Sequence, residues 1–245
     1  SSAASDVYKR QVERRQTLPV LANVLLVLRE KELSLTGTDL EVELVGKTEV
    51  DQAYQSGEVT VPARKLLDIC KSLSEGATLD IALADKKLVL KSGRSRFSLT
   101  TLAASEFPNV EEEPDTFSLS MDQSKLRQLL DNTSFAMAQQ DVRYYLNGML
   151  FEVGKDYLRV VATDGHRLAM ETVSLDSALA DIQQQIVPRK GVVELSRLLS
   201  DEGGDITLTF GQNHIRAKVP EFTFTSKLVD GKFPDYNRVL PKGGN

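Results

Sequence analysis

The stretch Thr163-Asp-Gly-His-Arg167 holds the residue types that come closest to a catalytic pair. A carboxylate and an imidazole this close together could act as a general base, which would suit a hydrolase. The same Asp-Gly dipeptide is also typical of a tight turn between two strands. Other catalytic signals are weak: no serine lies in a nucleophile elbow, no second histidine has metal-ligand spacing, and Gly165 lies outside any phosphate-binding glycine loop. A hydrolase that uses Asp164 and His166 stays as an alternative interpretation.

Two segments that each follow a Val-Pro pair repeat one pattern of charges. Proline suits the first turn of a helix, because its missing N–H would have no partner there. Helices are therefore expected to begin at Pro62 and Pro188, 126 positions apart. Side chains at i, i+4 and i+7 share one side of a helix, and these positions carry the same signs of charge in both: Arg64, Asp68 and Lys71, and Lys190, Glu194 and Arg197.

The opposite side of each predicted helix is apolar, with Leu66, Ile69 and Leu73 in the first and Val192, Leu195 and Leu199 in the second. A solvated surface would explain one such helix. Its recurrence in a chain whose net charge is −5 indicates instead that positive potential is gathered on one surface.

A third polar stretch, RYYLNG at 143–148, places two adjacent tyrosines beside an arginine and close to Gln140. Neighbouring side chains of a strand face opposite sides. A strand here would therefore bury one tyrosine and expose the other. The stretch does not identify a ligand by itself.

These segments belong to an internal repeat that covers most of the chain. When the halves are displaced by about 125 residues, LSLTGTD at 33–39 falls on LRVVATD at 158–164, and the segment 102–108 falls on 228–234. Self-similarity over this length indicates a duplicated domain, because solenoid repeats have periods of about 20 to 50 residues.

Each copy is predicted to be α+β, with mostly antiparallel sheet and few helices. Apolar residues alternate with polar ones, as half-buried strands require, at Leu79, Ile81 and Leu83 and at Ile206, Leu208 and Phe210. A helix from about Gln123 to Phe135, capped by Asp122, is expected in the second copy. Its inner stripe comprises Leu126, Leu129, Leu130 and Thr133. The counterpart of this helix in the first copy would fall in or before residues 1–11.

Composition limits the class of protein. The chain has 245 residues, of which 41% are apolar, and its apolar runs are too short for a membrane span. The single cysteine, Cys70, excludes an internal disulfide framework, and its position in an apolar helical stripe predicts a core residue in a reducing compartment, the cytoplasm. One cysteine and two histidines also argue against a metal site, and we expect no cofactor.

The ends and the middle of the chain suggest its divisions. Residues 1–11, SSAASDVYKRQ, lack the pattern of a signal peptide, and we interpret them as a non-native leader. The acidic stretch VEEEP at 110–114 is the expected link between the copies. This divides the chain into a first domain, 12–113, truncated at its start, and a second domain, 114–245.

Many long strings of the sequence resemble one family in the right order. They include RRQTLPVLANVLL, VPARKLLDIC, GRSRFSLTTL, QDVRYYLNGMLFE, ATDGHRLA and FTSKLVDGKFPDYNRVLP. The chain resembles the beta subunits of bacterial DNA polymerase III, the sliding clamps, over about residues 12–241. In that family three similar domains form each subunit, and a head-to-tail dimer makes a ring of six domains around duplex DNA.

The resemblance implies a duplicated clamp fold whose helices line the DNA-facing side, and a non-enzymatic processivity factor. Contact with the phosphates alone lets such a ring slide without choosing a sequence. The implied partners are duplex DNA, the DNA polymerase III catalytic subunit, the clamp loader and other proteins with a clamp-binding motif. The implied DNA-binding residues are Arg15, Arg64, Gln140, Tyr144, Tyr145 and Lys190.

The family's second site is an apolar groove that accepts a short peptide from partner proteins. The matching residues are Leu146, Thr163, Gly165, His166, Arg167, Leu168, Pro234, Arg238 and Val239. A plain hairpin over the domain core is the alternative for this stretch. A peptide-binding scaffold unrelated to DNA is a further alternative for the whole chain.

A third implied surface is the dimer face, where the first domain meets the third domain of the partner subunit. Its residues are Lys65, Arg94, Arg96 and Phe97, although Phe97 could equally be an ordinary inward residue of its strand. The chain stops where a third domain would begin, and a ring closes only when both complementary ends exist. We therefore do not expect this chain alone to form the family's dimer.

Overall fold

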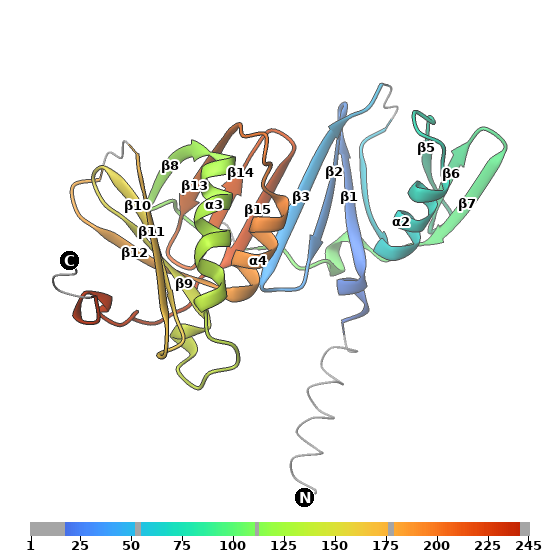
Figure 1. Ribbon diagram of the computed structural model, residues 1–245. Coiled ribbons are helices and arrows are strands. Elements are labelled where there is room, and N and C mark those ends of the chain that lie inside the picture. The colour runs from blue at the N-terminus through green and yellow to red at the C-terminus, as the bar shows by residue number, and fades with distance from the viewer. Residues whose placement is uncertain (1–17, 52–54, 111–112, 176–178, 241–245) are drawn as a thin grey trace, which may run out of the picture. The chain divides into compact units, whose positions relative to one another are not determined.

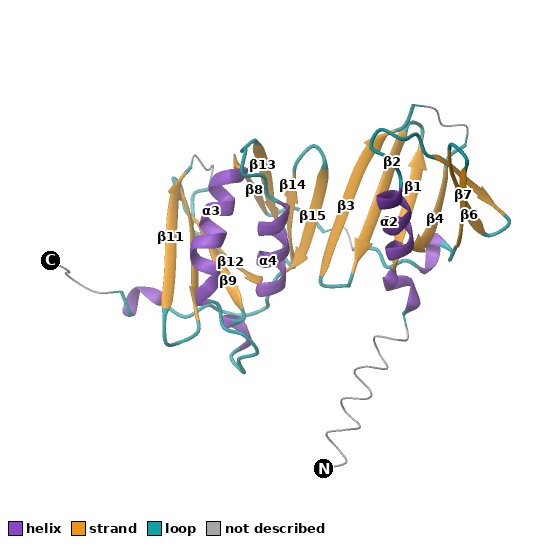
Figure 2. Ribbon diagram, turned by 45° about the vertical axis from the view of Figure 1, so that its right-hand side comes forward, coloured by secondary structure: helices purple, strands orange, loops and turns teal. Residues whose placement is uncertain are grey.

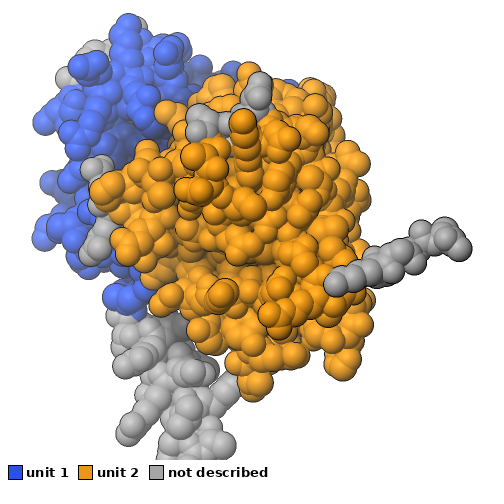
Figure 3. Space-filling model, turned by 90° about the vertical axis from the view of Figure 1, so that its left-hand side faces the viewer, with its two compact units in different colours: residues 1–111 blue, residues 112–245 orange. Residues whose placement is uncertain are grey.

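The structure is a computed structural model and describes residues 18–51, 55–110, 113–175 and 179–240 (Figure 1). The interpreted leader, 1–11, and Arg15 lie outside the described residues. Contacts within the chain divide it into two compact units, unit 1 at 1–111 and unit 2 at 112–245, which Figure 3 colours blue and orange. The division falls inside the acidic stretch 110–114.

The described part of unit 1 has two antiparallel sheets and one α-helix. The strand orders are β4-β1-β2-β3 and β5-β6-β7. The strands are β1 Asn23–Arg29, β2 Glu32–Thr38, β3 Val42–Glu49, β4 Gly57–Pro62, β5 Asp80–Ala84, β6 Lys87–Ser92 and β7 Ser95–Thr100. The helix is α2 Ala63–Ser72, and the 3-10 turns are η1 Pro19–Ala22 and η2 Ala104–Glu106.

The described part of unit 2 repeats this plan with two α-helices, α3 and α4, which pack side by side (Figure 2). The strand orders are β15-β14-β13-β8 and β11-β10-β9-β12. The strands are β8 Phe117–Asp122, β9 Gly148–Val153, β10 Tyr157–Thr163, β11 Leu168–Ser174, β12 Gln183–Pro188, β13 Asp205–Phe210, β14 His214–Lys218 and β15 Phe222–Lys227. The helices are α3 Gln123–Thr133 and α4 Arg189–Leu198, and the 3-10 turns are η3 Ser134–Ala136, η4 Tyr144–Leu146 and η5 Tyr236–Arg238.

The predicted α+β class with antiparallel sheets is confirmed. Asp122 caps α3 as expected: its Oδ1 accepts hydrogen bonds from the amides of Ser124, at 2.9 Å, and Lys125, at 3.3 Å. The predicted inner stripe of α3 is buried. The helices α2 and α4 each begin one residue after the expected proline, which forms the N-cap.

The alternating strand of the second copy is also confirmed, as β13. Its residues Ile206, Leu208 and Phe210 are fully buried. The neighbouring strand β8 covers the outer edge of β13, and Phe117 stacks on Phe210 with ring centroids 4.5 Å apart. Phe151 of β9, in the other sheet of unit 2, also packs against Phe210, with ring centroids 6.3 Å apart. The strand β13 is therefore enclosed both at its edge and on its apolar side.

The corresponding strand of the first copy, β5, differs from the expectation. Ile81 is 40% exposed and Leu83 is 58% exposed. They face the same side of the sheet as their paired residues Leu90 and Leu88, which belong to the core of unit 1. The strand β5 is the end strand of its sheet, and no strand pairs with its outer edge among the described residues, whereas β13 lies between β8 and β14.

The prediction that Cys70 is a core residue is wrong, because its side chain is exposed. The apolar stripe of α2 is narrower than its sequence suggested: Leu66 alone is buried, and Ile69 and Leu73 are half-buried. Among the described helices, none has the length and apolar character needed to cross a membrane.

Candidate functional site

Three loops that are far apart in the sequence meet over one part of the core of unit 2. The loop before β9, the turn between β10 and β11, and the segment after β15 all contribute side chains to it. Its buried members include Leu146, Val161, Phe233 and Tyr236, and Leu168 packs against them. The convergence expected of TDGHRL and PDYNRVLP is therefore present.

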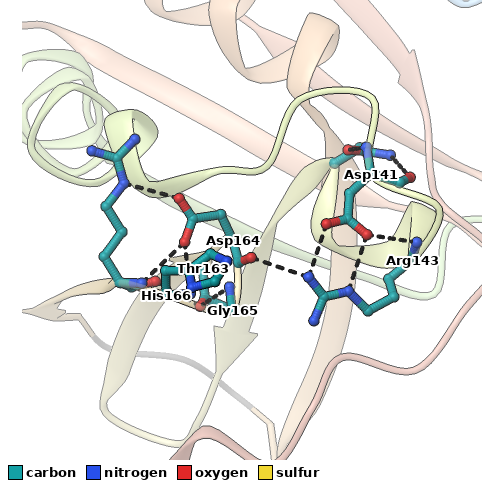
Figure 4. Close-up of polar contacts among 8 residues, drawn as sticks. Asp141, Arg143, Thr163, Asp164, Gly165 and His166 are labelled. Carbon is teal, nitrogen blue, oxygen red and sulfur yellow. Dashed lines mark hydrogen bonds and ion pairs between the residues drawn. The ribbon is translucent and has the colours of Figure 1, made fainter.

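Arg143 joins two of these loops (Figure 4). Its Nε and Nη2 donate to Asp141 Oδ1 at 3.0 Å and Oδ2 at 2.8 Å, and Nη2 also donates to the carbonyl oxygen of Asp164 at 3.2 Å. The bonds from Arg143 lower the pKa of Asp141 to about 2. Gly165 has a φ of +89°, and a Cβ there would lie 2.9 Å from Arg143 Nη1, so the turn accepts only glycine without rearrangement.

The sequence did not single out Asp141, although it closes this loop. Asn147 accepts from the Asp141 amide at 2.9 Å and donates to its carbonyl oxygen at 2.9 Å. A signal was available in the sequence, because Asp and Asn commonly bond to nearby backbone. Asp141 lies two residues before Arg143 and six residues before Asn147.

The Asp164 carboxylate is used by the turn itself. Its Oδ1 accepts from the amides of His166, at 2.9 Å, and Arg167, at 3.0 Å, and its Oδ2 accepts from Arg167 Nε at 3.0 Å. The amide bonds from His166 and Arg167 lower the pKa of Asp164. A carboxylate bonded in this way is a weaker base than a free one, so the hydrolase alternative gains no support from the geometry.

The residues expected to bind a peptide lie together in unit 2. Thr163 and Leu168 are half-buried, and the others that reach the surface are Gly165, His166, Arg167, Pro234, Arg238 and Val239. We call these residues the peptide patch. Leu146, also expected at this site, is only 2% exposed and lies in the core against which Leu168 packs. A charged residue at 146 would therefore destabilise unit 2.

The two tyrosines of RYYLNG lie in the 3-10 turn η4 and not in a strand. The expected division holds nevertheless: Tyr145 packs against the core, whereas Tyr144 is exposed. Their rings meet edge to face with centroids 5.7 Å apart. Gln140, also exposed, has a φ of +57°.

The repeated cations occupy equivalent places on α2 and α4. Arg64 and Lys71 are exposed on α2, as Lys190 and Arg197 are on α4. Arg197 bonds to Glu194 at 3.1 Å, which reproduces the mixed charge expected of this side of the helix. Both helices therefore present the same pattern of charge to solvent.

The residues assigned to the dimer face lie on α2 and around β7. Lys65, Arg94 and Arg96 are exposed. Phe97 is half-buried against the core of unit 1, on the same side of the sheet as Leu90. It is thus an inward residue of its strand with part of its ring still accessible.

Comparison with known proteins places this geometry in a class. The N-terminal domain model of the DNA polymerase III beta subunit matches residues 3–111, and the central domain model matches 120–235. The chain therefore belongs to the family of DNA polymerase III beta subunits.

Individual relatives agree. The beta sliding clamp of Pseudomonas putida is 62% identical over 96% of this chain and 64% of its own length, and that of Escherichia coli is 50% identical over 93% and 62%. The crystal structure of the DNA polymerase III subunit beta from Pseudomonas aeruginosa superposes with a TM-score of 0.91 at 62% identity, over 94% of this chain and 63% of that one. The chain thus spans less than two thirds of the length of these relatives.

Proposed function

We propose that this chain carries the DNA-facing and partner-binding surfaces of a sliding clamp. Such a protein is a cytoplasmic, non-enzymatic processivity factor that encircles duplex DNA. It tethers the DNA polymerase III catalytic subunit, the clamp loader and other proteins with a clamp-binding motif.

The observation that carries the proposal is the repeat of exposed cations on α2 and α4. Arg64 and Lys190 stand at the same position of the two helices, as do Lys71 and Arg197. A duplex presents a regular lattice of phosphates, so a duplicated protein that contacts it needs the same charges in each copy. Gln140, Tyr144 and Tyr145 would add contacts from their loop, and Arg15 is proposed on family resemblance alone.

Salt-dependent binding tests the DNA surface. Replacing Arg64 and Lys190 by Ala should flatten the slope of log K against log salt by about 2, because each lost phosphate contact removes about 0.9. The measurement is fluorescence anisotropy of a labelled duplex over a series of salt concentrations. The control replaces Lys31 and Lys218, one exposed lysine from each unit, and changes the net charge equally. An equal loss of slope in the control would show that only overall charge matters.

The peptide patch is the proposed site for partner proteins. Leu168 and Val239 offer aliphatic surface beside the polar ends of the turn, the mixture that peptide sites use. The substitution Val239→Asp should weaken binding of a peptide ending in Leu-Phe by at least about tenfold, the loss that one buried apolar contact can cause. Val142, which is 95% exposed against 68% for Val239, allows the same exchange as a control. Equal affinities of the two variants would place the peptide elsewhere.

The dimer face is proposed to meet an acidic partner surface through Lys65, Arg94 and Arg96, with Phe97 at its centre. Light scattering combined with size exclusion should find this chain alone to be monomeric or weakly self-associating. A stable closed ring formed by this chain alone would contradict this proposal.

A further inference from the structure

A carboxylate is buried in the middle of the sheet beneath the peptide patch. Glu152 lies on β9, and only 5% of its surface is exposed. Removing a carboxylate from water is costly unless hydrogen bonds replace the lost solvation. No role was predicted for this residue, and neither the proposed DNA contact nor the proposed peptide contact explains it.

Glu152 belongs to a row of polar residues that crosses the whole sheet. Antiparallel pairing places Arg159 of β10 on one side of it and Gln184 of β12 on the other. Gln184 Nε2 donates to Oε2 at 2.6 Å, and Arg159 Nη1 donates to Oε1 at 3.3 Å. Arg159 Nε reaches on to Thr172 of β11 at 3.0 Å. Each member of the row therefore has a partner on a neighbouring strand.

Two tyrosines complete the set, and one of them comes from outside the sheet. Tyr157 of β10 donates to Glu152 Oε1 at 3.0 Å, and Tyr236 of η5 donates to the same oxygen at 2.8 Å. The Tyr236 hydroxyl also accepts from Arg159 Nη1 at 3.0 Å. Burial raises the pKa of both phenols, so both stay protonated donors at neutral pH.

Tyr236 is the buried point of a segment that is otherwise exposed. Pro234, Asp235, Arg238 and Val239 around it all reach solvent. Asp235 bonds within the segment, to the Asn237 amide at 3.2 Å and to Arg238 Nε at 3.1 Å. These local bonds shape the 3-10 turn, whereas the polar bonds of Tyr236 fix that turn to the sheet.

We infer that Glu152 is a positioning residue for the peptide patch, acting through the hydroxyl of Tyr236 to hold residues 234–239 in place. The inference rests on the proposed peptide-binding function. A segment held by its one buried side chain loses little freedom when a peptide arrives, which favours binding.

The two tyrosines supply a matched test. Tyr236→Phe and Tyr157→Phe each remove one hydroxyl donor from the same carboxylate oxygen. Tyr236→Phe also removes an acceptor of Arg159 Nη1, and only Tyr236 lies in the segment that carries part of the patch. Binding of a fluorescent peptide ending in Leu-Phe should weaken about 3- to 10-fold in Tyr236→Phe, the range of one net hydrogen bond, and less than about 2-fold in Tyr157→Phe. Equal losses in the two variants, or none in Tyr236→Phe, would overturn the inference.

Hydrogen exchange separates this inference from the proposed function. In Tyr236→Phe the amides of Asn237 and Val239 should exchange faster, since they bond within the turn that Tyr236 holds. Tyr157→Phe should leave them unchanged. If the unmodified chain binds no peptide, the peptide proposal fails, and unchanged exchange in Tyr236→Phe would still refute the positioning role.

Discussion

The strands β5 and β13 stand at the same place in the two copies and differ in what covers them. Their hairpins align Leu83 with Phe210 and Ile81 with Leu208. In unit 2 these side chains are fully buried beside β8, whereas in unit 1 they are largely exposed. The period of two in the sequence thus determines which side of a strand is apolar. Whether that side is buried depends on the elements that pack around it, β8 and β9 in the case of β13, which the alternation does not encode.

The repeated helices α4 and α2 also differ in burial at one equivalent position. Gly191 of α4 is buried, and a Cβ there would collide with Ser226 of β15. The equivalent residue of α2 is Lys65, whose side chain is exposed. One helix is pressed against its sheet through a glycine, and the other leaves room for a long side chain at the same turn.

The largest expected difference between the copies is in the free energy of unfolding that is lost when an apolar side chain of β13 or β5 is shortened to alanine. Leu208→Ala should lower the free energy of unfolding by about 2–5 kcal/mol, because it empties a fully buried site. Leu83→Ala, at a site 58% exposed, should cost less than about 1 kcal/mol. Urea denaturation followed by circular dichroism measures both. Similar losses would mean that β5 is covered in solution as β13 is.

Gly191→Ala should destabilise unit 2 by about 1–3 kcal/mol through overpacking against Ser226. In an open helix the same exchange would stabilise, since alanine is the better helix former. Thermal unfolding of Gly191→Ala, alone and combined with Ser226→Ala, checks the cause, because the second substitution should restore part of the loss. Lys65→Ala is the matched change in unit 1 and should alter stability by less than about 0.5 kcal/mol.

The tips of the two equivalent hairpins differ in a way that should make the stability of unit 2 depend on acid pH. In unit 2, Glu113 Oε1 accepts from the His214 amide at 2.8 Å, and its carboxylate also accepts from the Asn213 amide. Burial opposes the charge of Glu113, but these bonds and the His214 ring outweigh it and hold its pKa below the ordinary 4.5. In unit 1 the equivalent tip, Asp85-Lys86, is a tight turn with positive φ at both residues.

A lowered pKa contributes stability that is present above the unfolded pKa, near 4.5, and is lost as the pH falls through the folded value. Glu113→Gln should therefore be less stable than the unmodified chain at pH 7, and the difference should shrink as the pH is lowered below 4.5. Urea midpoints at pH 7 and at acid pH test this. A difference independent of pH would show that the charge of Glu113 is unimportant.

The smallest expected effect concerns Cys70 and its counterpart Ser196. Cys70 is exposed, so it should react with a thiol reagent in the folded protein, and Cys70→Ser should change stability by less than about 0.5 kcal/mol. Ser196 bonds to Asp131 of α3 at 2.5 Å, and Ser196→Ala should cost more. If Cys70 reacted only under denaturing conditions, it would be buried in the folded protein, as the sequence pattern predicted.

Patterns of short range predicted their structures well. The cap at Asp122, the stripe of α3 and the strand β13 each follow from residues within a few positions of one another. The convergence of TDGHRL with PDYNRVLP could not be obtained from spacing, and came from the resemblance to the family. The resemblance also groups residues by site and does not report depth, so the burial of Leu146 was known only from the structure.

Long-range polar bonds were beyond what the sequence could show. Glu152 and Tyr236 are 84 positions apart, and nothing in the local sequence of either predicts a shared hydrogen bond. The prediction that Cys70 is buried was wrong for a related reason. A helical stripe predicts which side faces the sheet, but its width depends on how closely neighbouring elements approach.

The bonds of Glu113 have a mechanical consequence. This residue lies ahead of β8 in the chain, and its carboxylate is attached to the start of β14. A pulling force applied through the residues before it would reach the carboxylate before it reaches the ladder between β8 and β13. Under tension, the hydrogen bonds of the Glu113 carboxylate would therefore break before those between β8 and β13. Acid would lower the force at which they break, because a protonated carboxyl group accepts hydrogen bonds less strongly.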